Sequence, residues 1–343
     1  MKAWIEILKL GRLLSIMSKV NQFYRGNVIK VLKKDGFFNY FDVPRRLNEI
    51  SEHFGYVDKE FLKELLNILV VDKSLFQLDD DLYGHVSSLD ESWIEPEVMT
   101  KSMREVWISY AEALPARLRG KYIQFSGGLD LYNWDDSLVS TAYEQMRRAA
   151  FAYSDALTRS GRFLDIGCGN GYGTARIWAY YHNQGYFDGS LKHIKISALD
   201  INPSFLNLAK AEFKRNVAKA IGTSPEEIEG LSNNIPEFFQ ATMENIPKED
   251  NTFDVTYASQ ILHWANPEAA ISEILRVTKP GGLFFGTQMF LDNVNPFVRL
   301  HTLVIEGANG HFTKDQFIRW AKAAGAKKVS ISTPISVFKV IKG

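Results

Sequence analysis

Apolar residues recur at helical spacing through much of the first ninety residues. From Lys59 to Val71 they return every three or four positions, which predicts an amphipathic helix, and Asp58 suits its N-cap. Shorter helices are predicted over residues 27–34 and 46–53. These segments predict a small, mainly helical N-terminal domain.

A hairpin is predicted directly after these helices. Two short apolar runs, 75–78 and 82–86, flank a turn made of Asp79–Asp81. Three helices and a hairpin are typical of a winged helix, a fold that often binds DNA through its third helix. Here the third helix carries balanced charge, and the aspartates at the hairpin tip would repel phosphates. We therefore expect residues 1–90 to serve dimerisation or to form a lid, with a homodimer as the assembly and no nucleic acid as partner.

The first twenty residues have a narrow polar stripe on an otherwise apolar helix. The charged positions on that stripe are Lys2, Glu6, Lys9, Arg12 and Lys19. One interpretation buries the wide apolar face against a partner subunit or the domain core. The other places the basic segment 1–34 on a membrane surface as a peripheral contact. Both interpretations stay open.

Residues 91–150 are predicted to be a helical connector with many aromatic side chains. Rings in such numbers pack between domains or line a pocket. Tyr143 and Met146 lie near the end of this segment, and we expect them in the substrate pocket.

A strand, a glycine-rich loop and a helix follow one another over residues 163–181. Alternate glycines at 167, 169 and 171 allow a sharp turn and close approach to a ligand. A dinucleotide-binding fingerprint needs a third glycine where Tyr172 or Thr174 stands, and a phosphate-binding P-loop needs a Gly-Lys pair that is missing. The remaining pattern is Asp-x-Gly-x-Gly-x-Gly, with the acid on the strand.

This pattern resembles the first motif of the class I S-adenosylmethionine-dependent methyltransferases. Further segments that resemble the family follow in order at Ile196–Ile201, Phe238–Pro247, Thr252–Trp264, Arg276–Phe285 and Phe312–Gly325. The resemblance implies an α/β fold: a Rossmann-like seven-stranded sheet over residues 151–343, closed by an antiparallel hairpin at 328–332 and 337–341. The winged-helix-like domain would precede it.

The resemblance also implies a set of residues that bind S-adenosylmethionine. These are Asp165, Gly167, Cys168, Gly169, Gly171, Asp200, Ile201, Thr242, Met243 and Gln260. Asp200 would accept hydrogen bonds from both ribose hydroxyls. Thr242 stands where the family usually has an aspartate, and its hydroxyl still accepts a hydrogen bond from the adenine amino group.

His263 is the candidate general base. Its position is similar to that of the histidine which small-molecule O-methyltransferases use to deprotonate a hydroxyl, and imidazole titrates close to neutral pH. Tyr172 and Trp264 follow the first and fourth strands, where ligands of α/β proteins bind, and are expected in the substrate pocket. The N-terminal layout resembles those O-methyltransferases, whereas the catalytic half looks closer to ubiquinone/menaquinone C-methyltransferases. An aromatic, quinone-like or lipid-like acceptor is therefore expected.

Composition excludes several other classes. With 343 residues, 45% of them hydrophobic, the chain is long enough for two domains, and its 40 basic residues balance 40 acidic ones. One cysteine forms neither an internal disulfide nor a Cys-based zinc site, and no long apolar run exists, so a cytoplasmic protein without metal is expected. Two alternatives remain: a cofactor-sensing winged-helix regulator, and a methyltransferase acting on protein or RNA.

Overall fold

The chain forms two compact units. Met1–Trp134 and Val294–Gly310 make the N-terminal unit, and Asp135–Asn293 with His311–Gly343 make the C-terminal unit. The predicted connector 91–150 is thus divided between them. The structure, a computed structural model, describes residues 2–86, 89–90, 92, 99–123, 141–187, 193–228, 230–332 and 336–343, with the backbone alone for 2–17 and 141–142.

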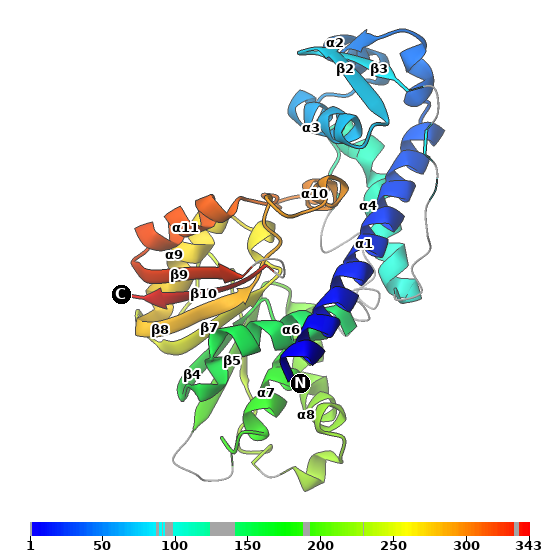
Figure 1. Ribbon diagram of the computed structural model, residues 1–343. Coiled ribbons are helices and arrows are strands. Elements are labelled where there is room, and N and C mark those ends of the chain that lie inside the picture. Colours follow the sequence, from blue (N-terminus) through cyan, green and yellow to red (C-terminus); the bar gives the residue numbers. More distant parts are fainter. Residues whose placement is uncertain are drawn as a thin grey trace. The chain divides into compact units, whose positions relative to one another are not determined.

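The N-terminal unit is mainly helical (Figure 1). Its elements are α1 (Lys2–Lys34), η1 (Phe38–Asp42), β1 (Arg45–Arg46), α2 (Leu47–Phe54), α3 (Lys59–Val71), β2 (Leu75–Asp79), β3 (Leu82–His85), α4 (Lys101–Leu118) and α10 (Pro296–Leu303). The strands form one antiparallel sheet in the order β1-β3-β2. The predicted hairpin and helix α3 are confirmed, and Asp58 caps α3 by accepting a hydrogen bond from the Phe61 amide.

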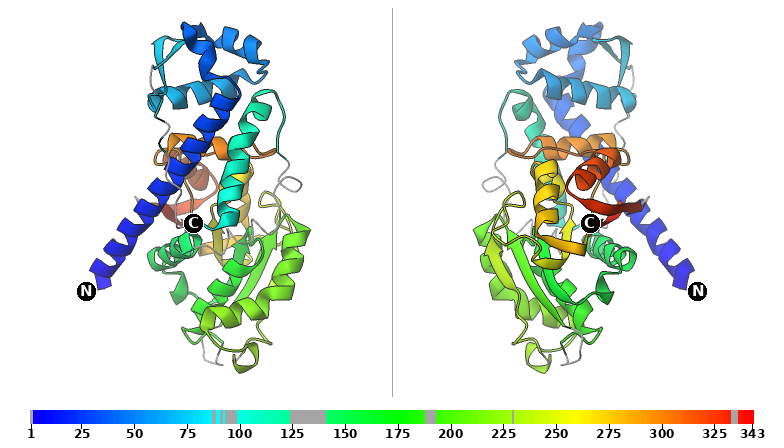
Figure 2. Two further views of the ribbon diagram at one scale, coloured as in Figure 1. Left: turned by 90° about the vertical axis from the view of Figure 1, so that its right-hand side faces the viewer. Right: turned by 90° about the vertical axis from the view of Figure 1, so that its left-hand side faces the viewer.

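Helix α1 is one continuous helix, which corrects the prediction of two separate ones. It runs beside α4 (Figure 2). Gly26 disfavours a helix by about 1 kcal/mol relative to alanine, but the residues around it are held by packing. Tyr24 and Val28 are fully buried, and Arg25 donates two hydrogen bonds to the Asp72 carboxylate. The predicted apolar face of residues 1–17 lies outside the described side chains. Across the part of the chain that the structure describes, no helix has the length and apolarity to cross a membrane.

The C-terminal unit is built on a seven-stranded sheet in the order β6-β5-β4-β7-β8-β10-β9. Its strands are β4 (Gly161–Ile166), β5 (Ile194–Asp200), β6 (Glu237–Gln240), β7 (Phe253–Ser259), β8 (Thr278–Thr287), β9 (Ala326–Ser332) and β10 (Val337–Lys342). Strands β4 to β8 are parallel, whereas β10 pairs antiparallel with both β8 and β9. The predicted α/β fold with a closing hairpin is confirmed.

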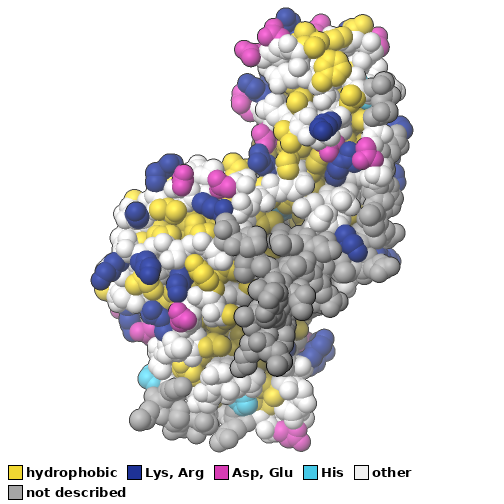
Figure 3. All heavy atoms as spheres, in the orientation of Figure 1, with side chains coloured by type: hydrophobic (Ala, Val, Ile, Leu, Met, Phe, Trp, Pro, Cys, Tyr) yellow, Lys and Arg dark blue, Asp and Glu magenta, His cyan; other side chains and the backbone are white. Residues whose placement is uncertain are grey.

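Helices cover both faces of this sheet. They are α6 (Thr141–Ser154), α7 (Tyr172–His182), α8 (Pro203–Ile221), α9 (Pro267–Val277) and α11 (Lys314–Ala323), with short helices η2 (Ala156–Thr158), η3 (Pro225–Glu227) and η4 (Leu262–Trp264). Phe163 packs into one core with side chains of α6, α7 and α8, and its neighbour Leu164 packs into the other core with α9 and α11. This alternation is the two-residue period of a strand buried on both faces. Basic and acidic side chains are interspersed over the surface seen in Figure 3, in keeping with the balanced composition.

Gly171 limits how closely α7 and α8 approach each other. Its φ is 76°, and a Cβ at this position would lie 2.6 Å from the Cβ of Ala209 on α8. Gly222, which ends α8, has a similar φ of 91° but nothing within 4 Å of the same point. The first glycine therefore combines a backbone requirement with a packing requirement, and the second has only the backbone requirement.

We expect Gly171→Ala to lower the free energy of unfolding by about 2–4 kcal/mol, because left-handed strain and overpacking add. The matched variant Gly222→Ala is expected to lose only about 1 kcal/mol, from strain alone. Urea denaturation of both variants and the wild type measures the difference. Equal losses would contradict the packing role of Gly171.

Candidate functional site

The candidate site lies where β4, β5 and β7 end. Strand β4 pairs with β5 on one side and with β7 on the other, so the connections that leave these strands diverge between β4 and β7. In parallel sheets such a divergence opens a crevice at the carboxyl ends of the strands, and ligands bind there. Figure 1 shows these strands side by side. The sequence-predicted cofactor residues lie near the ends of these strands or on the loops that follow them, except Thr242 and Met243, which follow the neighbouring strand β6.

The glycine loop adopts backbone conformations that side chains disfavour. Gly167, Gly169 and Gly171 have φ values of 69°, 53° and 76°. A Cβ at position 167 would come within 2.9 Å of the Ile261 side chain, so the loop also lacks space there. The amide of Cys168 donates to the Leu199 carbonyl at 2.9 Å, which joins the loop to β5. The predicted turn is confirmed as a tightly packed backbone loop.

Cys168 is a packing residue in this loop. Its side chain is buried, and burial raises the pKa of the thiol well above its ordinary value. A neutral buried thiol is a poor nucleophile because the thiolate is the reactive form. The residue therefore contributes shape to the loop and no covalent chemistry.

Asp200 joins the end of β5 to the glycine loop. One carboxylate oxygen accepts the amide hydrogen of Gly169 at 2.8 Å, and the other accepts that of Asn202 at 2.9 Å. Burial raises the pKa of this carboxyl group, and the two amide hydrogen bonds oppose the shift. Each oxygen retains further acceptor capacity, which suits it to a ligand with two neighbouring hydroxyl groups. The next side chain, Ile201, is 58% exposed and offers an apolar surface beside the carboxylate.

Thr242 and Met243 follow β6 and are both half-buried. The amide of Ala241 donates to the Asp200 carbonyl at 3.2 Å, so this segment lies beside the end of β5. A β-bridge between Thr242 and Asn245 closes it into a tight turn. The geometry brings these two predicted residues to the same edge as Asp200.

Asp165 is a buried carboxyl group beneath the loop. It is 4% exposed, and its Oδ2 accepts a hydrogen bond of 2.6 Å from the hydroxyl of Thr174 on α7. Desolvation raises the pKa of Asp165 to about 6, although the hydrogen bond and the nearby Arg147 lower it. At neutral pH the group carries a negative charge that burial disfavours.

Gln260 is oriented by the end of β8. Its backbone has a φ of 55°, and its side chain donates to the Thr287 hydroxyl at 3.1 Å and accepts from the Met289 amide at 3.2 Å. The sulfur of Met146 lies 3.9 Å from its amide nitrogen. The structure therefore brings together two predicted residues that are 114 positions apart, one from each predicted set.

His263 lies on η4, directly after β7, and is 2% exposed. Its Nδ1 is 3.2 Å from the amide nitrogen of Gln288, which is also 3.2 Å from the Met289 carbonyl. The ring centres of Trp264 and His311 lie 4.7 Å and 4.9 Å from that of His263. The imidazole is thus held at Nδ1 within a buried polar and aromatic cluster.

Three residues of these surroundings were missed by sequence reasoning. Gln288 and His311 contact His263, but no short-range motif connects them to it. Arg147 on α6 is 7% exposed and forms an ion pair with Glu144. The only sequence signal for it was the spacing of three residues between an acid and a base on a predicted helix. Tyr143 and Tyr172 are half-buried near the ends of their helices, and their substrate contact stays a prediction.

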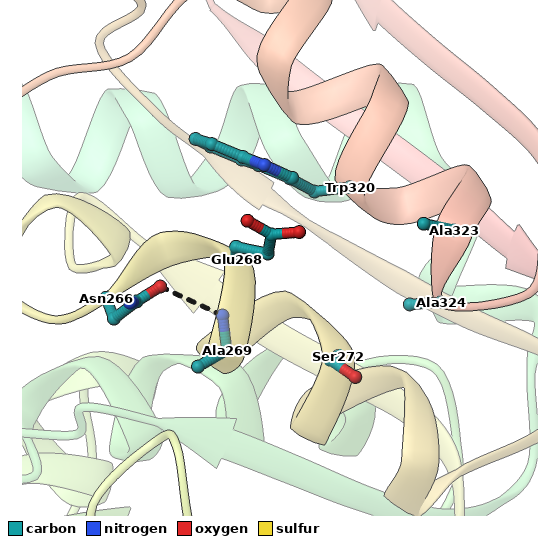
Figure 4. Close-up of a pocket in the computed structure, with 7 residues that line it drawn as sticks. All are labelled: Asn266, Glu268, Ala269, Ser272, Trp320, Ala323 and Ala324. Atoms are coloured by element: carbon teal, nitrogen blue, oxygen red, sulfur yellow. Dashed lines mark hydrogen bonds between the residues drawn. The ribbon is translucent and has the colours of Figure 1, made fainter.

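A hollow of about 330 Å³ lies elsewhere, between α9 and α11 (Figure 4). Seven residues line it: Asn266, Glu268, Ala269, Ser272, Trp320, Ala323 and Ala324. None of them belongs to the glycine loop or to the predicted cofactor set. Its charged lining is the single carboxylate of Glu268, and we do not assign it to the site.

Comparisons with known proteins agree with this geometry. Residues 164–286 match a family described as methyltransferase domain. An uncharacterised methyltransferase of Mycobacterium tuberculosis is 29% identical over 184 residues, 54% of this chain and 53% of the relative. The ubiquinone/menaquinone biosynthesis C-methyltransferase of Brucella abortus is 36% identical over 98 residues, 28% of this chain and 31% of the relative. The chain thus matches about half the length of the first of these relatives and less of the second.

Among solved structures, the CurJ carbon methyltransferase superposes with a TM-score of 0.68 at 16% identity. The match covers 97% of this chain and 93% of that one, so the likeness of fold includes the N-terminal unit. The C-terminal unit therefore contains a class I methyltransferase domain, and S-adenosylmethionine is the methyl donor of this class.

Asp165 is expected to make stability depend on pH. Its carboxyl group ionises near pH 3.8 in the unfolded chain and near pH 6 in the folded one. Between these values the folded state binds more protons, so wild-type stability falls as pH rises, and above about pH 6 the loss is complete. Asp165→Asn removes this titration. We therefore compare the free energies of unfolding of the variant and the wild type at each pH. The variant's value minus the wild-type value should rise by up to about 3 kcal/mol from pH 4 to pH 7.

Chemical denaturation of both proteins across pH 4–8 measures this difference. A difference that stays constant over the whole range would contradict the buried ionisation.

Proposed function

We propose that this protein transfers a methyl group from S-adenosylmethionine to a small-molecule acceptor. The observation that carries the proposal is the hydrogen bond that the Gly169 amide donates to the Asp200 carboxylate. It holds a carboxylate with spare acceptor capacity at the crevice where β4 and β7 diverge. The exposed Ile201 beside it supplies apolar surface for a flat ring.

The residues present fit the adenosine part of this cofactor. Asp200 would accept hydrogen bonds from the two ribose hydroxyls, and Ile201 and Met243 would pack against adenine. The Thr242 hydroxyl would accept a hydrogen bond from the adenine amino group. When bound, the cofactor supplies a methyl group already activated by the positive sulfur.

We favour a carbon atom as the acceptor, with an oxygen atom as the second choice. One solved structure that matches nearly the whole chain is a carbon methyltransferase, and one curated relative is a C-methyltransferase of quinone biosynthesis. In either reaction the bond from methyl carbon to sulfur breaks, a bond from methyl carbon to the acceptor forms, and the acceptor gives up a proton. A group that takes this proton is required near the acceptor.

His263 is the residue we propose for that proton. It lies in the buried cluster at the end of β7, where water is scarce and orientation is maintained. Gln288 engages its Nδ1, and we propose Nε2 as the nitrogen that exchanges a proton with the acceptor. A base at Nε2 requires Nδ1 to carry the hydrogen. The Gln288 amide would then turn its carbonyl oxygen toward Nδ1 and give up the hydrogen bond that its nitrogen donates to the Met289 carbonyl. That oxygen, Oε1, has no hydrogen-bond partner among the described residues.

The N-terminal unit is proposed to mediate a homodimer. Three of its apolar side chains, Val43, Phe76 and Leu78, are 50%, 39% and 58% exposed. Phe76 and Leu78 lie on β2, an edge strand of the small sheet, and exposed apolar edge strands favour association.

Titration of S-adenosylmethionine into the protein, followed by calorimetry, tests cofactor binding. Asp200→Asn is expected to weaken affinity on the order of 10- to 100-fold, because it removes charge-assisted hydrogen bonds. Asp254→Asn is the matched control, since Asp254 also accepts a backbone amide hydrogen, from Arg162, but at the start of β7. The control should bind within about twofold of wild type. A folded wild type that fails to bind would overturn the proposal.

Transfer of radiolabelled methyl tests the acceptor class. We expect label to enter a 1,3-dicarbonyl carbon acid in preference to a phenol. His263→Ala should then lower kcat by about 100- to 10,000-fold, the usual contribution of a general base, while cofactor affinity stays unchanged. If only the phenol is labelled, the methyl acceptor is an oxygen atom and not a carbon atom. An unchanged kcat in the variant would contradict the role of His263 as the general base.

A further inference from the structure

The hollow between α9 and α11 is lined by a set of side chains that the proposed methyl transfer does not use. It lies between the first turn of α9, which contributes Glu268 and Ala269, and the end of α11, which contributes Trp320, Ala323 and Ala324 (Figure 4). Its volume of about 330 Å³ is within the range of pockets that hold small molecules. The hollow is therefore large enough for a small ligand of its own.

Trp320 forms one side of the hollow and is held in place by the core behind it. Its ring centre lies 5.3 Å from that of Phe312, and its side chain packs against the core beneath α9 and α11 while staying half-exposed. The core thus fixes the orientation of the indole ring. The faces of such a ring are electron-rich and attract cations.

Glu268 presents the only charged group among the seven residues that line the hollow. Its carboxylate and the indole ring of Trp320 are turned toward each other (Figure 4). Within the described part of the chain, this carboxylate forms neither an ion pair nor a hydrogen bond. A negative group and an electron-rich ring face repel each other, whereas a cation between them is attracted by both.

The two helix ends at the hollow also favour a cation over an anion. In the first turn of α9, Pro267 has no amide hydrogen, and the Ala269 amide donates to the Asn266 side chain at 3.1 Å. The Ala270 amide donates to the Asn266 carbonyl at 2.9 Å, so this turn has few amide hydrogens left for an anion. The last carbonyl groups of α11 add partial negative charge, which stabilises a cation nearby.

The remaining lining residues suit a methylated ammonium group better than a primary one. Ala269, Ala323 and Ala324 present methyl groups, and Ser272 presents one hydroxyl. A primary ammonium has three N–H donors that need acceptors, whereas a trimethylammonium has none. Its methyl groups can pack against the alanines and the indole ring, and aromatic side chains are a known means of binding quaternary ammonium ions.

We propose that this hollow binds a small organic cation whose trimethylammonium group lies between the Trp320 ring and the Glu268 carboxylate. The ligand is assigned as a free small molecule because the volume is that of a small-molecule pocket. The inference goes beyond the proposed methyl transfer and does not depend on it.

The alternative is that Glu268 only stabilises the start of α9, because an acid in the first turn of a helix offsets the helix dipole. Glu60 offers a matched comparison. It is the second residue of α3, as Glu268 is of α9, and both side chains are exposed. A role in helix stability alone predicts that Glu268→Gln and Glu60→Gln behave alike toward any ligand.

Calorimetric titration of three ligands into the full chain tests the binding chemistry. Choline carries the trimethylammonium group, 3,3-dimethyl-1-butanol has the same shape with a neutral carbon in place of the nitrogen, and ethanolamine keeps the charge without the methyl groups. We expect choline to bind at least about 10-fold more tightly than either analogue. Equal affinity for choline and either analogue would overturn the proposal, as would a folded wild type that binds none of the three.

Variants locate the site. Glu268→Gln should weaken choline about 2- to 5-fold and Trp320→Leu about 3- to 30-fold, whereas Glu60→Gln should bind choline as wild type does. Trp320→Phe keeps an aromatic ring against Phe312 and serves if the leucine variant fails to fold, with an expected loss of about 2- to 5-fold. Unchanged choline affinity in Glu268→Gln or in the Trp320 variants would overturn the assignment, and so would an equal loss in Glu60→Gln.

Vesicles of phosphatidylcholine distinguish the source of the trimethylammonium group. We expect no sedimentation with these vesicles that depends on Glu268. Sedimentation of the wild type that is lost in Glu268→Gln would overturn the assignment to a free small molecule and indicate a lipid headgroup instead.

Discussion

The close approach of the glycine loop to its neighbours is the constraint on which the rest of the C-terminal unit depends. The loop has no room for side chains beside Ile261 and Ala209, and its backbone turns through conformations that favour glycine. Because the loop lies so close, the Gly169 amide reaches the Asp200 carboxylate, and α7 begins directly over Asp165. The ends of β4 and β5 are thereby tied into one surface. Gly173, the second residue of α7, likewise has no side chain, and the guanidinium group of Arg147 lies against it.

Buried charge is the second theme of this unit. Asp165, Glu144 and Arg147 lie on the face of the sheet covered by α6 and α7, and each is buried or largely so. Burying ionised groups is costly unless they are paired, and here the pairing is incomplete. Glu144 is shared among three arginines, and Asp165 titrates close to neutral pH. Such imbalance is typical of sites that bind a charged ligand rather than of a core optimised for stability.

The polar cluster at the end of β7 follows different physics. His263, Gln260 and Gln288 are nearly inaccessible to water, and their side chains hydrogen-bond to residues at the end of β8. This arrangement fixes orientation without net charge. A methyl transfer that releases a proton needs one oriented proton acceptor in a water-poor place, and the proposed base, His263, lies in such a place.

The sequence by itself determined the features that depend on neighbours close in the chain. The apolar period of α3 and its Asp58 cap, the hairpin at β2 and β3, and the turn from β4 through Gly171 into α7 all follow from local sterics and hydrogen bonds. Likewise the acid at the end of β5 could be assigned from its position after an apolar strand.

Tertiary structure decided what depends on residues far apart. Helix α1 continues through Gly26, where Arg25 pairs with Asp72, 47 positions away. Helix α10 joins the N-terminal unit although strands β4 to β8 of the C-terminal sheet precede it in the sequence. Gln288 reaches His263, and Arg147 reaches the start of α7, only once the strands and helices have packed. The apolar period of a helix or strand predicts which of its faces is buried, but it does not predict which other element packs against that face. Those contacts emerge only from the folded chain, because burial energy is non-directional and the partner is chosen by shape and charge in three dimensions.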